Sequence, residues 1–444
     1  MTPLCIQQSA MHRVLLLSHT TGYQLRAFNA AAEALGMELV FATDRCHRLD
    51  DPWQDRAIPV RFHEPDASVA AIARRARDYP VHGVIAVGDR PVVLAARAAE
   101  ALGLPWHSVA GARAATDKRR SRTTLMRAGL PSPRFTVVPA HRMAGSAAAA
   151  MGEYPCVLKP LGMSGSRGVI RANTADEFSV AFDRICALLA RPQVRAARAG
   201  LEDQILVEQY IDGAEFALEG VLTHGRLEVF AIFDKPDPLE GPFFEETIYV
   251  TPSRLPAALQ SGLASHVHHA ADALGLSHGS VHAECRVTAA GTIYVLEVAA
   301  RPIGGLCSKV LSFTRGPGAA ATPDLPRDLS RPLEEVLLQH AVGRSIGDYT
   351  LDSHAAAVMM IPIPERGIYK GASGEAGARS VPGVTDLVIT AKVGQLLETL
   401  PEAGSYLGFI FAEAEEPEAA AAAVRDAHRR LAFSVSRELE VRGV

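Results

Sequence analysis

The stretch HAECRVTAAGTIYVLEVAARPIGG, from His282 to Gly305, decides how the rest of the chain is interpreted. Two runs rich in β-forming residues flank a turn that contains Ala290-Gly291, and this pattern predicts a β-hairpin. If the turn is centred between those two residues, Glu284 on the first strand lies directly opposite Glu297 on the second. The sequence therefore predicts two neighbouring carboxylates on one face of a sheet.

Like charges placed directly opposite each other destabilise a sheet unless a cation lies between them. Mg²⁺ is such a cation, since it prefers carboxylate oxygens and phosphate as ligands. The same register puts Arg286 opposite Val295 and His282 opposite Ala299. A register slip, or two exposed acids in an ordinary sheet, is the alternative. We therefore interpret the hairpin as a candidate metal site.

Composition excludes several classes of protein. The chain has 444 residues, which predicts more than one domain, and its net charge of −4 with a pI of about 6.5 favours neither nucleic acid nor an anionic membrane as a partner. The six cysteines show no CxxC spacing, which is typical of a reducing cytoplasm. The short apolar run near the N-terminus is interpreted as a first strand and not as a signal peptide.

The N-terminal region alternates strand-like and helix-like segments. This alternation predicts a doubly wound parallel sheet, whose ligands usually lie where the strands end, here near Asp89. No glycine fingerprint for a dinucleotide is present. The expected strands are 13–19, 37–44 and 81–89, and the expected helices are 20–36, 68–80 and 91–105.

A glycine-rich loop follows the strand that ends at Lys159. Glycines free backbone N–H groups, and small hydroxyls add donors, so such a loop can wrap around phosphate oxygens. It is neither a P-loop nor a Rossmann fingerprint, and a plain hairpin turn is the alternative. The loop residues that carry this prediction are Gly162, Ser164, Gly165, Ser166 and Gly168.

The second half of the chain predicts mainly antiparallel structure. Residues 204–236 alternate like a meander, with turns at Asp212-Gly213 and His224-Gly225. A Gly-, Pro- and Ala-rich stretch at 314–328 predicts a linker or surface loop. Beyond it, a helix at 332–343, strands at 355–364, 384–391 and 406–414, and a closing helix at 416–435 predict an α+β domain.

The order of these features resembles the ATP-grasp superfamily. Lys118 on a helix, Lys159 before the glycine-rich loop, VEQYIDGAEF at 207–216, and the Glu284–Glu297 pair followed by Arg301 occur in the superfamily's order. The segments at 234–256, 282–305 and 361–374, together with YLGFIFAEA, resemble its L-amino acid ligase branch. Members of this branch are carboxylate–amine ligases that make dipeptides or related amides.

The resemblance implies an ATP-grasp fold, in the α/β and α+β multidomain class. A doubly wound parallel βαβ domain would span residues 1–112, and an ATP-grasp region would span 113–325. That region divides into a first subdomain with the glycine-rich loop, 113–207, and a second with the metal site, 208–325. A C-terminal α+β ligase domain would span 326–444.

The resemblance also implies residue roles. Glu284 and Glu297 would hold Mg²⁺, expected as two ions, with Mn²⁺ as an alternative. The catalytic residues would be Arg301, Glu297, Glu284 and Lys159. ATP would contact Lys118, Lys159, Gly162, Ser164, Gly165, Ser166, Gly168, Glu208, Gln209, Ile211 and Glu215, with adenine read by backbone groups of 208–211 or by the Glu208 carboxylate. Arg301, Gly304 and Gly305 would contact substrate. Apart from the resemblance, the aromatic and acidic stretch 242–250 indicates that Glu245 or Glu246 contacts the amino group of a substrate, or else that the stretch is an exposed strand, and His282 is a further candidate contact.

The implied reaction joins a carboxylate to an amine through an acyl phosphate, with ADP and phosphate as products. A carboxylase or nucleotide-pathway synthetase of the same fold, or an ATP-binding protein without catalysis, is the alternative. ATP-grasp enzymes commonly have an Asn metal ligand where this chain has Ala299. We hypothesise that His282 or a water takes that place, or else that His282 only packs or contacts substrate. Amino acid substrates, a homodimer and a cytoplasmic location are expected.

Overall fold

The computed structural model describes residues 11–19, 24–44, 57–145, 153–197, 200–315 and 330–437. The N-terminal part is a parallel sheet in the order β3-β2-β1-β4, as the alternation of strands and helices predicts. The described part of the 20–36 prediction is helical, and the rest of it lies outside the described residues. The elements are β1 (Arg13–Ser18), α1 (Gln24–Ala34), β2 (Glu38–Thr43), β3 (Ile58–Pro59), α2 (Pro65–Asp78), β4 (Gly83–Val87), α3 (Val92–Leu102) and α4 (Val109–Ala115).

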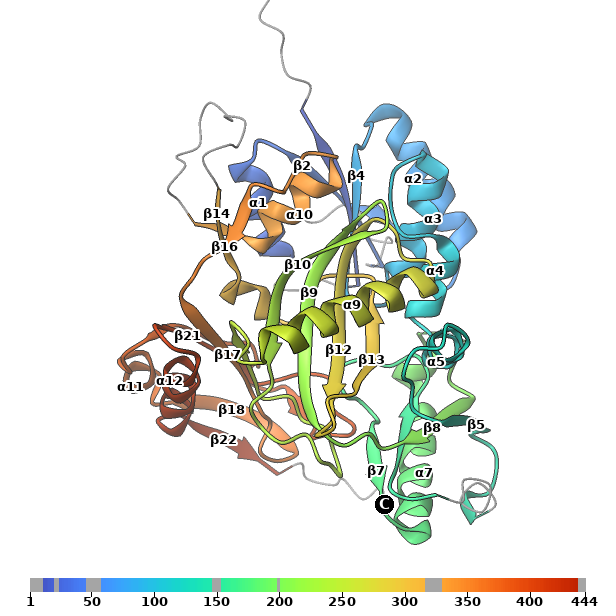
Figure 1. Cartoon of the computed structure of the whole chain (residues 1–444), viewed down its shortest axis with the longest axis vertical. Coiled ribbons are helices and arrows are strands. Elements are labelled where there is room, and N and C mark those ends of the chain that lie inside the picture. Colours follow the sequence, from blue (N-terminus) through green and yellow to red (C-terminus); the bar gives the residue numbers. More distant parts are fainter. Residues whose placement is uncertain are drawn as a thin grey trace, which may run out of the picture.

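A second, four-stranded sheet has the order β5-β8-β6-β7 and packs against helix α7. Figure 1 places it at the lower right of the molecule, below the N-terminal part. Asp117 accepts hydrogen bonds from the backbone of Arg119 and Arg120, and this cap starts helix α5 at Lys118. The elements are α5 (Lys118–Arg127), β5 (Phe135–Pro139), β6 (Cys156–Pro160), β7 (Ile170–Ala172), α7 (Ala175–Leu189), α8 (Pro192–Arg195) and β8 (Gln204–Gln209).

The centre of the molecule is an eight-stranded sheet in the order β13-β12-β9-β10-β11-β17-β21-β19. Helix α9 lies across its β9–β13 part (Figure 1). The predicted meander is wrong in its first strand: β8 pairs with β5 and β6, so Asp212-Gly213 carries the chain from one sheet to another. The elements are β9 (Ala214–Thr223), β10 (Arg226–Asp234), β11 (Ile248–Thr251), α9 (Ala257–Leu274), β12 (Gly279–Val287) and β13 (Ile293–Ala299).

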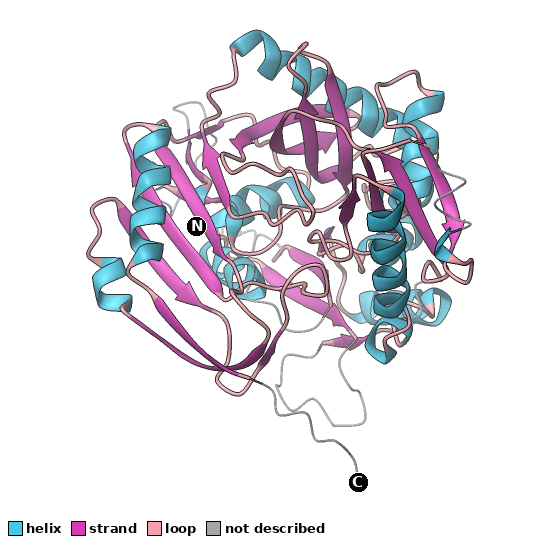
Figure 2. Ribbon diagram, turned by 90° about the horizontal axis from the view of Figure 1, so that it is seen from below, coloured by secondary structure: helices cyan, strands magenta, loops and turns pink. Residues whose placement is uncertain are grey.

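The C-terminal strands β17, β21 and β19 extend this same central sheet, and the C-terminal part also forms a three-stranded sheet of its own in the order β20-β18-β22. The predicted closing helix is too long, since α12 (Pro417–Arg429) is followed by β22 (Ala432–Ser436). Figure 2 shows the C-terminal helices packed on one side of these strands. The remaining elements are the 3₁₀ turn η1 (Cys307–Val310), β14 (Ser312–Arg315), β15 (Arg331–Pro332), α10 (Leu333–Ala341), β16 (Tyr349–Leu351), β17 (Ala355–Ile361), β18 (Gly367–Ser373), α11 (Glu375–Arg379), β19 (Val384–Ile389), β20 (Leu396–Leu397) and β21 (Gly408–Ala414).

Helix α10 connects the C-terminal part of the chain to the N-terminal part. It packs against α1 and β4 of the N-terminal part, and its Leu333 and Val336 share a buried cluster with Phe28. The approach is so close that a Cβ at Gly83 would lie 2.2 Å from the Ala341 carbonyl oxygen. The linker predicted at 314–328 lies mostly outside the described residues. No helix in the described ranges is both long and apolar enough to cross a bilayer.

Candidate active site

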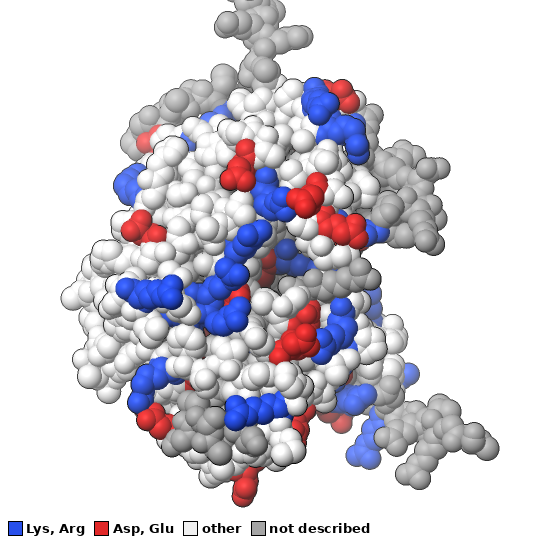
Figure 3. All heavy atoms as spheres, turned by 90° about the vertical axis from the view of Figure 1, so that its right-hand side faces the viewer, with Lys and Arg blue, Asp and Glu red and all other residues white. Residues whose placement is uncertain are grey.

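The hairpin β12–β13 brings the two predicted carboxylates together. Glu284 pairs with Glu297, as the sequence predicts, and both residues line a pocket between the central sheet, helix α5 and the β5–β8 sheet. Residues at directly opposite positions share one face of a sheet, so both carboxylates lie on the pocket side of the hairpin. Basic and acidic side chains gather around a hollow on the face of the molecule that Figure 3 shows.

A β-bulge next to this pair changes the rest of the register. Arg286 pairs with Tyr294, so the predicted pairing of Arg286 with Val295 is wrong. The bulge leaves Leu296 without a partner in the hairpin ladder, and its carbonyl accepts a hydrogen bond from Arg122 Nη1 at 2.6 Å. The Ala-Gly turn alone did not reveal the bulge, because a bulge adds one residue to one strand without changing the alternation on either side.

Most of the predicted site residues line the pocket. Gly162, Gly168, Glu245, Gly304 and Gly305 do not. Those that do are Lys118, Lys159, Ser164, Gly165, Ser166, Glu208, Gln209, Ile211, Glu215, Glu246, His282, Glu284, Glu297 and Arg301. Residues that the sequence reasoning missed are Pro133, Val157, Met163, Val169, Tyr210, Leu239, Phe244, Arg286 and Leu296.

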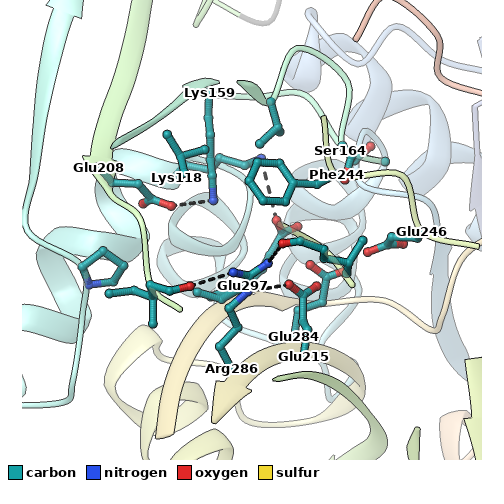
Figure 4. A pocket seen from close by; sticks show the side chains of 18 of the residues that line it. Lys118, Lys159, Ser164, Glu208, Glu215, Phe244, Glu246, Glu284, Arg286 and Glu297 are labelled. Carbon is teal, nitrogen blue, oxygen red and sulfur yellow. Dashed lines mark hydrogen bonds and ion pairs between the residues drawn. The ribbon is translucent and has the colours of Figure 1, made fainter. Parts of the chain in front are cut away.

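The two lysines and the acids enter the pocket from different sides (Figure 4). Lys118, in the first turn of α5, donates a hydrogen bond to the Met163 carbonyl at 2.5 Å and lies 3.7 Å from Glu297. The distance to Glu297 is longer than a hydrogen bond, so this carboxylate keeps oxygens that can bind a further cation. Lys159 comes from the end of β6.

Glu208 is part of a buried ion cluster. Its carboxylate accepts hydrogen bonds from Arg122 Nε at 2.7 Å and Nη2 at 3.2 Å, and Lys159 Nζ lies 2.5 Å away. Burial alone would raise the pKa of Glu208, but the two cations lower it to about 2. Arg122 and Lys159 hold this carboxylate, and its contact with adenine stays a prediction. The backbone of Gln209 and Ile211 remains a predicted adenine contact as well.

A second buried cation lies beside Glu284. The Lys235 ammonium is 2.8 Å from Glu215, 2.6 Å from Glu246 and 3.4 Å from Glu284. Burial alone would lower the pKa of Lys235, but these three acids raise it well above its usual value. Oxygens of the same three acids lie within 4.8 Å of one another, and the single charge of Lys235 offsets only part of their negative charge. The one feature of the sequence that points to Lys235 is that lysines are rare in this chain.

Arg286 ties the acid cluster to the linker between the two sheets. Its Nε donates to Glu215 at 2.9 Å, its Nη1 to the Ile211 carbonyl at 2.7 Å and its Nη2 to the Leu239 carbonyl at 2.5 Å. Burial alone would raise the pKa of Glu215, but Lys235 and Arg286 lower it. Glu215 therefore stays ionised and fixes two cations at the pocket wall.

Arg301 spans the pocket from the central sheet to the N-terminal part. Its guanidinium holds Asp89 in a two-point contact, with Nε at 2.8 Å and Nη2 at 3.2 Å. Burial would lower the pKa of Arg301, but Asp89 raises it above its usual value, so the charge is permanent. Burial alone would raise the pKa of Asp89, but Arg301 and the nearby Ser164 hydroxyl lower it. Asp89, just after β4, thus lies between Arg301 and the glycine-rich loop.

His282 lies in the row next to Glu284 and faces Ala299, as the sequence predicts. Its Nδ1 is 3.1 Å from Glu219, a fully buried acid that also accepts the backbone N–H of Ile303 at 3.1 Å. Burial, Arg301 and Lys235 lower the pKa of His282 well below its usual value, so the imidazole is neutral. The structure thus explains what orients His282, and its role at a metal stays a prediction.

Comparison with known proteins agrees with this geometry. Three family profiles match the chain: the ATP-grasp N-terminal domain at residues 28–106, the ATP-grasp domain at 152–310 and the L-amino acid ligase C-terminal domain 2 at 359–436. These matches define a chain with the ATP-grasp fold, in which two ATP-grasp domains are followed by the L-amino acid ligase C-terminal domain 2.

Individual relatives are ATP-dependent ligases. A D-alanine–D-alanine ligase from Aromatoleum aromaticum is 28% identical over 62% of this chain and 78% of its own length. An alanine–anticapsin ligase from Bacillus subtilis is 27% identical over 53% of this chain and 52% of its own length. The solved structure of an L-amino acid ligase from Bacillus licheniformis has a TM-score of 0.78 at 24% identity, with 96% of this chain and 99% of that chain covered. That last likeness concerns the fold.

Proposed function

We propose that this protein joins a small carboxylate to an amine, at the expense of ATP, and forms an amide or dipeptide bond. The observation that carries the proposal is the charge arrangement in one pocket. Lys118 and Lys159 enter from one side, Glu284 and Glu297 lie opposite each other on the floor, and Arg301 is held beside them. The relatives named above, whose names specify alanine as a substrate, support amino acids as substrates.

The first step of the proposed reaction is transfer of the ATP γ-phosphoryl group to a carboxylate oxygen. The new bond is between that oxygen and phosphorus, and the bond to ADP breaks. Such a transfer depends on positioning and charge neutralisation more than on covalent help. Lys118 and Lys159 supply fixed positive charge, and backbone N–H groups of the glycine-rich loop add donors. We assign Gly162 and Gly168 to the shape of that loop.

Mg²⁺ fits the residues on the pocket floor. Glu297 lies 3.7 Å from the Lys118 ammonium and within the field of Arg301, and Glu284 shares the Lys235 ammonium with two other acids. Glu284 and Glu297 would hold the ion, as one or two Mg²⁺ or as Mn²⁺, through oxygen ligands. When bound, the metal neutralises phosphate charge during the transfer.

In the second step, the amine nitrogen attacks the acyl carbon of the phosphorylated substrate. A C–N bond forms, the amine loses a proton, and the C–O bond to phosphate breaks. Arg301 is the proposed partner of the negative charge that develops on the acyl oxygen, because its charge is permanent and its position is fixed by Asp89. We assign Gly304 and Gly305 to close backbone approach by the carboxylate.

The remaining roles are assigned by position. Glu246 lines the pocket and is the proposed contact for the amino group, with Glu245 as its neighbour outside the lining. Gln209 and Ile211 would read adenine through the backbone, next to the apolar side chains Leu239 and Phe244. We further propose a homodimer in the cytoplasm, in keeping with the composition of the chain.

A substrate matrix tests the proposed function. Pairs of amino acids and other small acids are incubated with ATP and Mg²⁺, and released phosphate is measured together with the amide product. We expect release that needs both substrates and the metal. ATP binding without release for any pair would refute catalysis, and release that needs bicarbonate in place of an amine would favour a carboxylase.

Two variants test the site. Glu297→Gln and Arg301→Ala should each lower kcat/KM by about 100-fold or more, the loss typical when a group that stabilises transition-state charge is removed. The matched controls are the exposed Glu100→Gln and Arg127→Ala, which should keep near-normal rates. Near-normal rates in either site variant, with the fold intact by circular dichroism, would refute the assignment.

A further inference from the structure

The glycine-rich loop, residues 162–168, is held in place by protein contacts on the pocket side. Lys118 Nζ donates to the Met163 carbonyl at 2.5 Å. Asp89 lies close to Ser164, whose hydroxyl lowers the pKa of the Asp89 carboxyl. Both partners belong to the charged machinery of the pocket. These two contacts tie the first half of the loop to helix α5 and to the end of strand β4.

The second half of the loop is held by the C-terminal part of the chain. The segment 398–404 between β20 and β21, here called the C-terminal clamp, reaches the end of the loop. The Gly168 backbone N–H donates to the Pro401 carbonyl at 2.8 Å. Arg167 Nε donates to the Glu402 carbonyl at 3.0 Å. Two successive loop residues are thus bonded to two successive carbonyls of the clamp.

The clamp is itself anchored to the helix behind the loop. The Glu402 carboxylate accepts Arg184 Nε at 2.6 Å and Nη2 at 2.8 Å, a two-point contact with helix α7. Glu398 accepts both of its bonds from Arg191 Nη1, at 2.8 and 2.9 Å, just beyond the same helix. A two-point Arg–carboxylate contact fixes orientation as well as distance. The Glu402 side chain therefore fixes the place where its own carbonyl meets Arg167.

We propose that Glu402 is a positioning residue for nucleotide binding. Through Arg184 it docks the C-terminal clamp, and through the clamp it holds the end of the glycine-rich loop over the pocket. None of Arg167, Arg184, Pro401 and Glu402 lines that pocket, so the effect is transmitted through the loop backbone. The contacts of the C-terminal clamp rest on geometry alone. Their consequence, tighter ATP binding, rests on the proposed function.

The contact between the C-terminal clamp and the glycine-rich loop is tested first, without nucleotide. Hydrogen exchange of the backbone N–H groups of 162–170 is compared in the wild-type protein, in Glu402→Gln and in Asp203→Asn. The last variant removes a carboxylate from an exposed ion pair with Arg195 in the same part of the molecule, away from the clamp. We expect faster exchange at Gly168 in Glu402→Gln only. Equal exchange in all three proteins would overturn the proposal, whether or not the protein uses ATP.

Kinetics provide the second test, on the full-length protein with its best substrate pair. Glu402→Gln should raise KM for ATP by about 3- to 10-fold and change kcat less than about twofold, because it loses a partly exposed ion pair that acts on binding. The charge-swapped pair Arg184→Glu with Glu402→Arg should restore most of the wild-type KM. A fall in kcat at constant KM, or no rescue by the swap in a folded protein, would overturn the proposal. Absence of ATP binding in wild type would refute the proposed function and leave the exchange result standing.

Discussion

Replacing Arg122 by Met tests the buried ion cluster that connects the two sheets of the pocket. Arg122 and Glu208 have side chains only 2% and 3% exposed, so neither charge is compensated by water. Breaking one partner of a buried pair typically costs about 3–5 kcal/mol. Lys159 stays 2.5 Å from Glu208 in the variant and keeps part of the compensation. We therefore expect a loss of about 3 kcal/mol in the free energy of unfolding.

The pKa of Glu208 supplies an independent magnitude. It is about 2 in the folded protein, against an ordinary value of 4.5, and this difference corresponds to about 3 kcal/mol at neutral pH. Because the pKa is lowered in the folded state, the stabilisation is fully present above about pH 4.5 and is lost as the pH falls toward 2. In Arg122→Met this acid-dependent loss should be smaller.

The assay is urea denaturation followed by circular dichroism, at pH 7 and at steps down to pH 3. The control is Arg120→Met, since the Arg120 side chain is 58% exposed and its buried partner Asp117 keeps its hydrogen bonds from the backbone of Arg119 and Arg120. That variant should lose less than about 1 kcal/mol. If Arg122→Met loses no more than the control, or if its pH dependence below 4.5 equals that of the wild type, the buried cluster does not stabilise the fold as reasoned.

Two further outcomes follow from packing and burial. Gly83→Ala should destabilise the protein by about 1–3 kcal/mol, because the new Cβ would lie 2.2 Å from the Ala341 carbonyl oxygen. Gly145→Ala is the control and should not destabilise it, because there is open space around Gly145. Equal melting temperatures of the two variants would contradict this reasoning. Burial lowers the pKa of three clustered histidines, His107, His278 and His340, to about 4. The free energy of unfolding should therefore fall as the pH drops from about 6.5 to 4, and it should fall less steeply in His278→Phe. Parallel curves of stability against pH for the two proteins would contradict this role of the histidines.

The sequence by itself determined the elements that local periodicity controls. Alternation predicts the two strands of the hairpin and the turn between them, but the pairs next to the turn are offset by one residue from the predicted register, and the bulge at Leu296 is what brings Glu297 opposite Glu284. Local patterns also predict the parallel N-terminal sheet and the start of α5, since Asp117 is a strong cap. Rules of strand alternation and helix capping act over a few residues, so they can be applied to a single sequence.

Tertiary structure alone decided which charges meet. Lys235, just beyond the end of β10, reaches Glu284, and Arg301 meets Asp89 although the two are 212 positions apart in the chain. The bulge at Leu296 depends on Arg122 from helix α5, and the clamp depends on Glu402. These contacts are set by how the sheets and helices pack. A charge far away in sequence leaves no local pattern, and only the fold shows which basic side chains each carboxylate of the pocket is paired with.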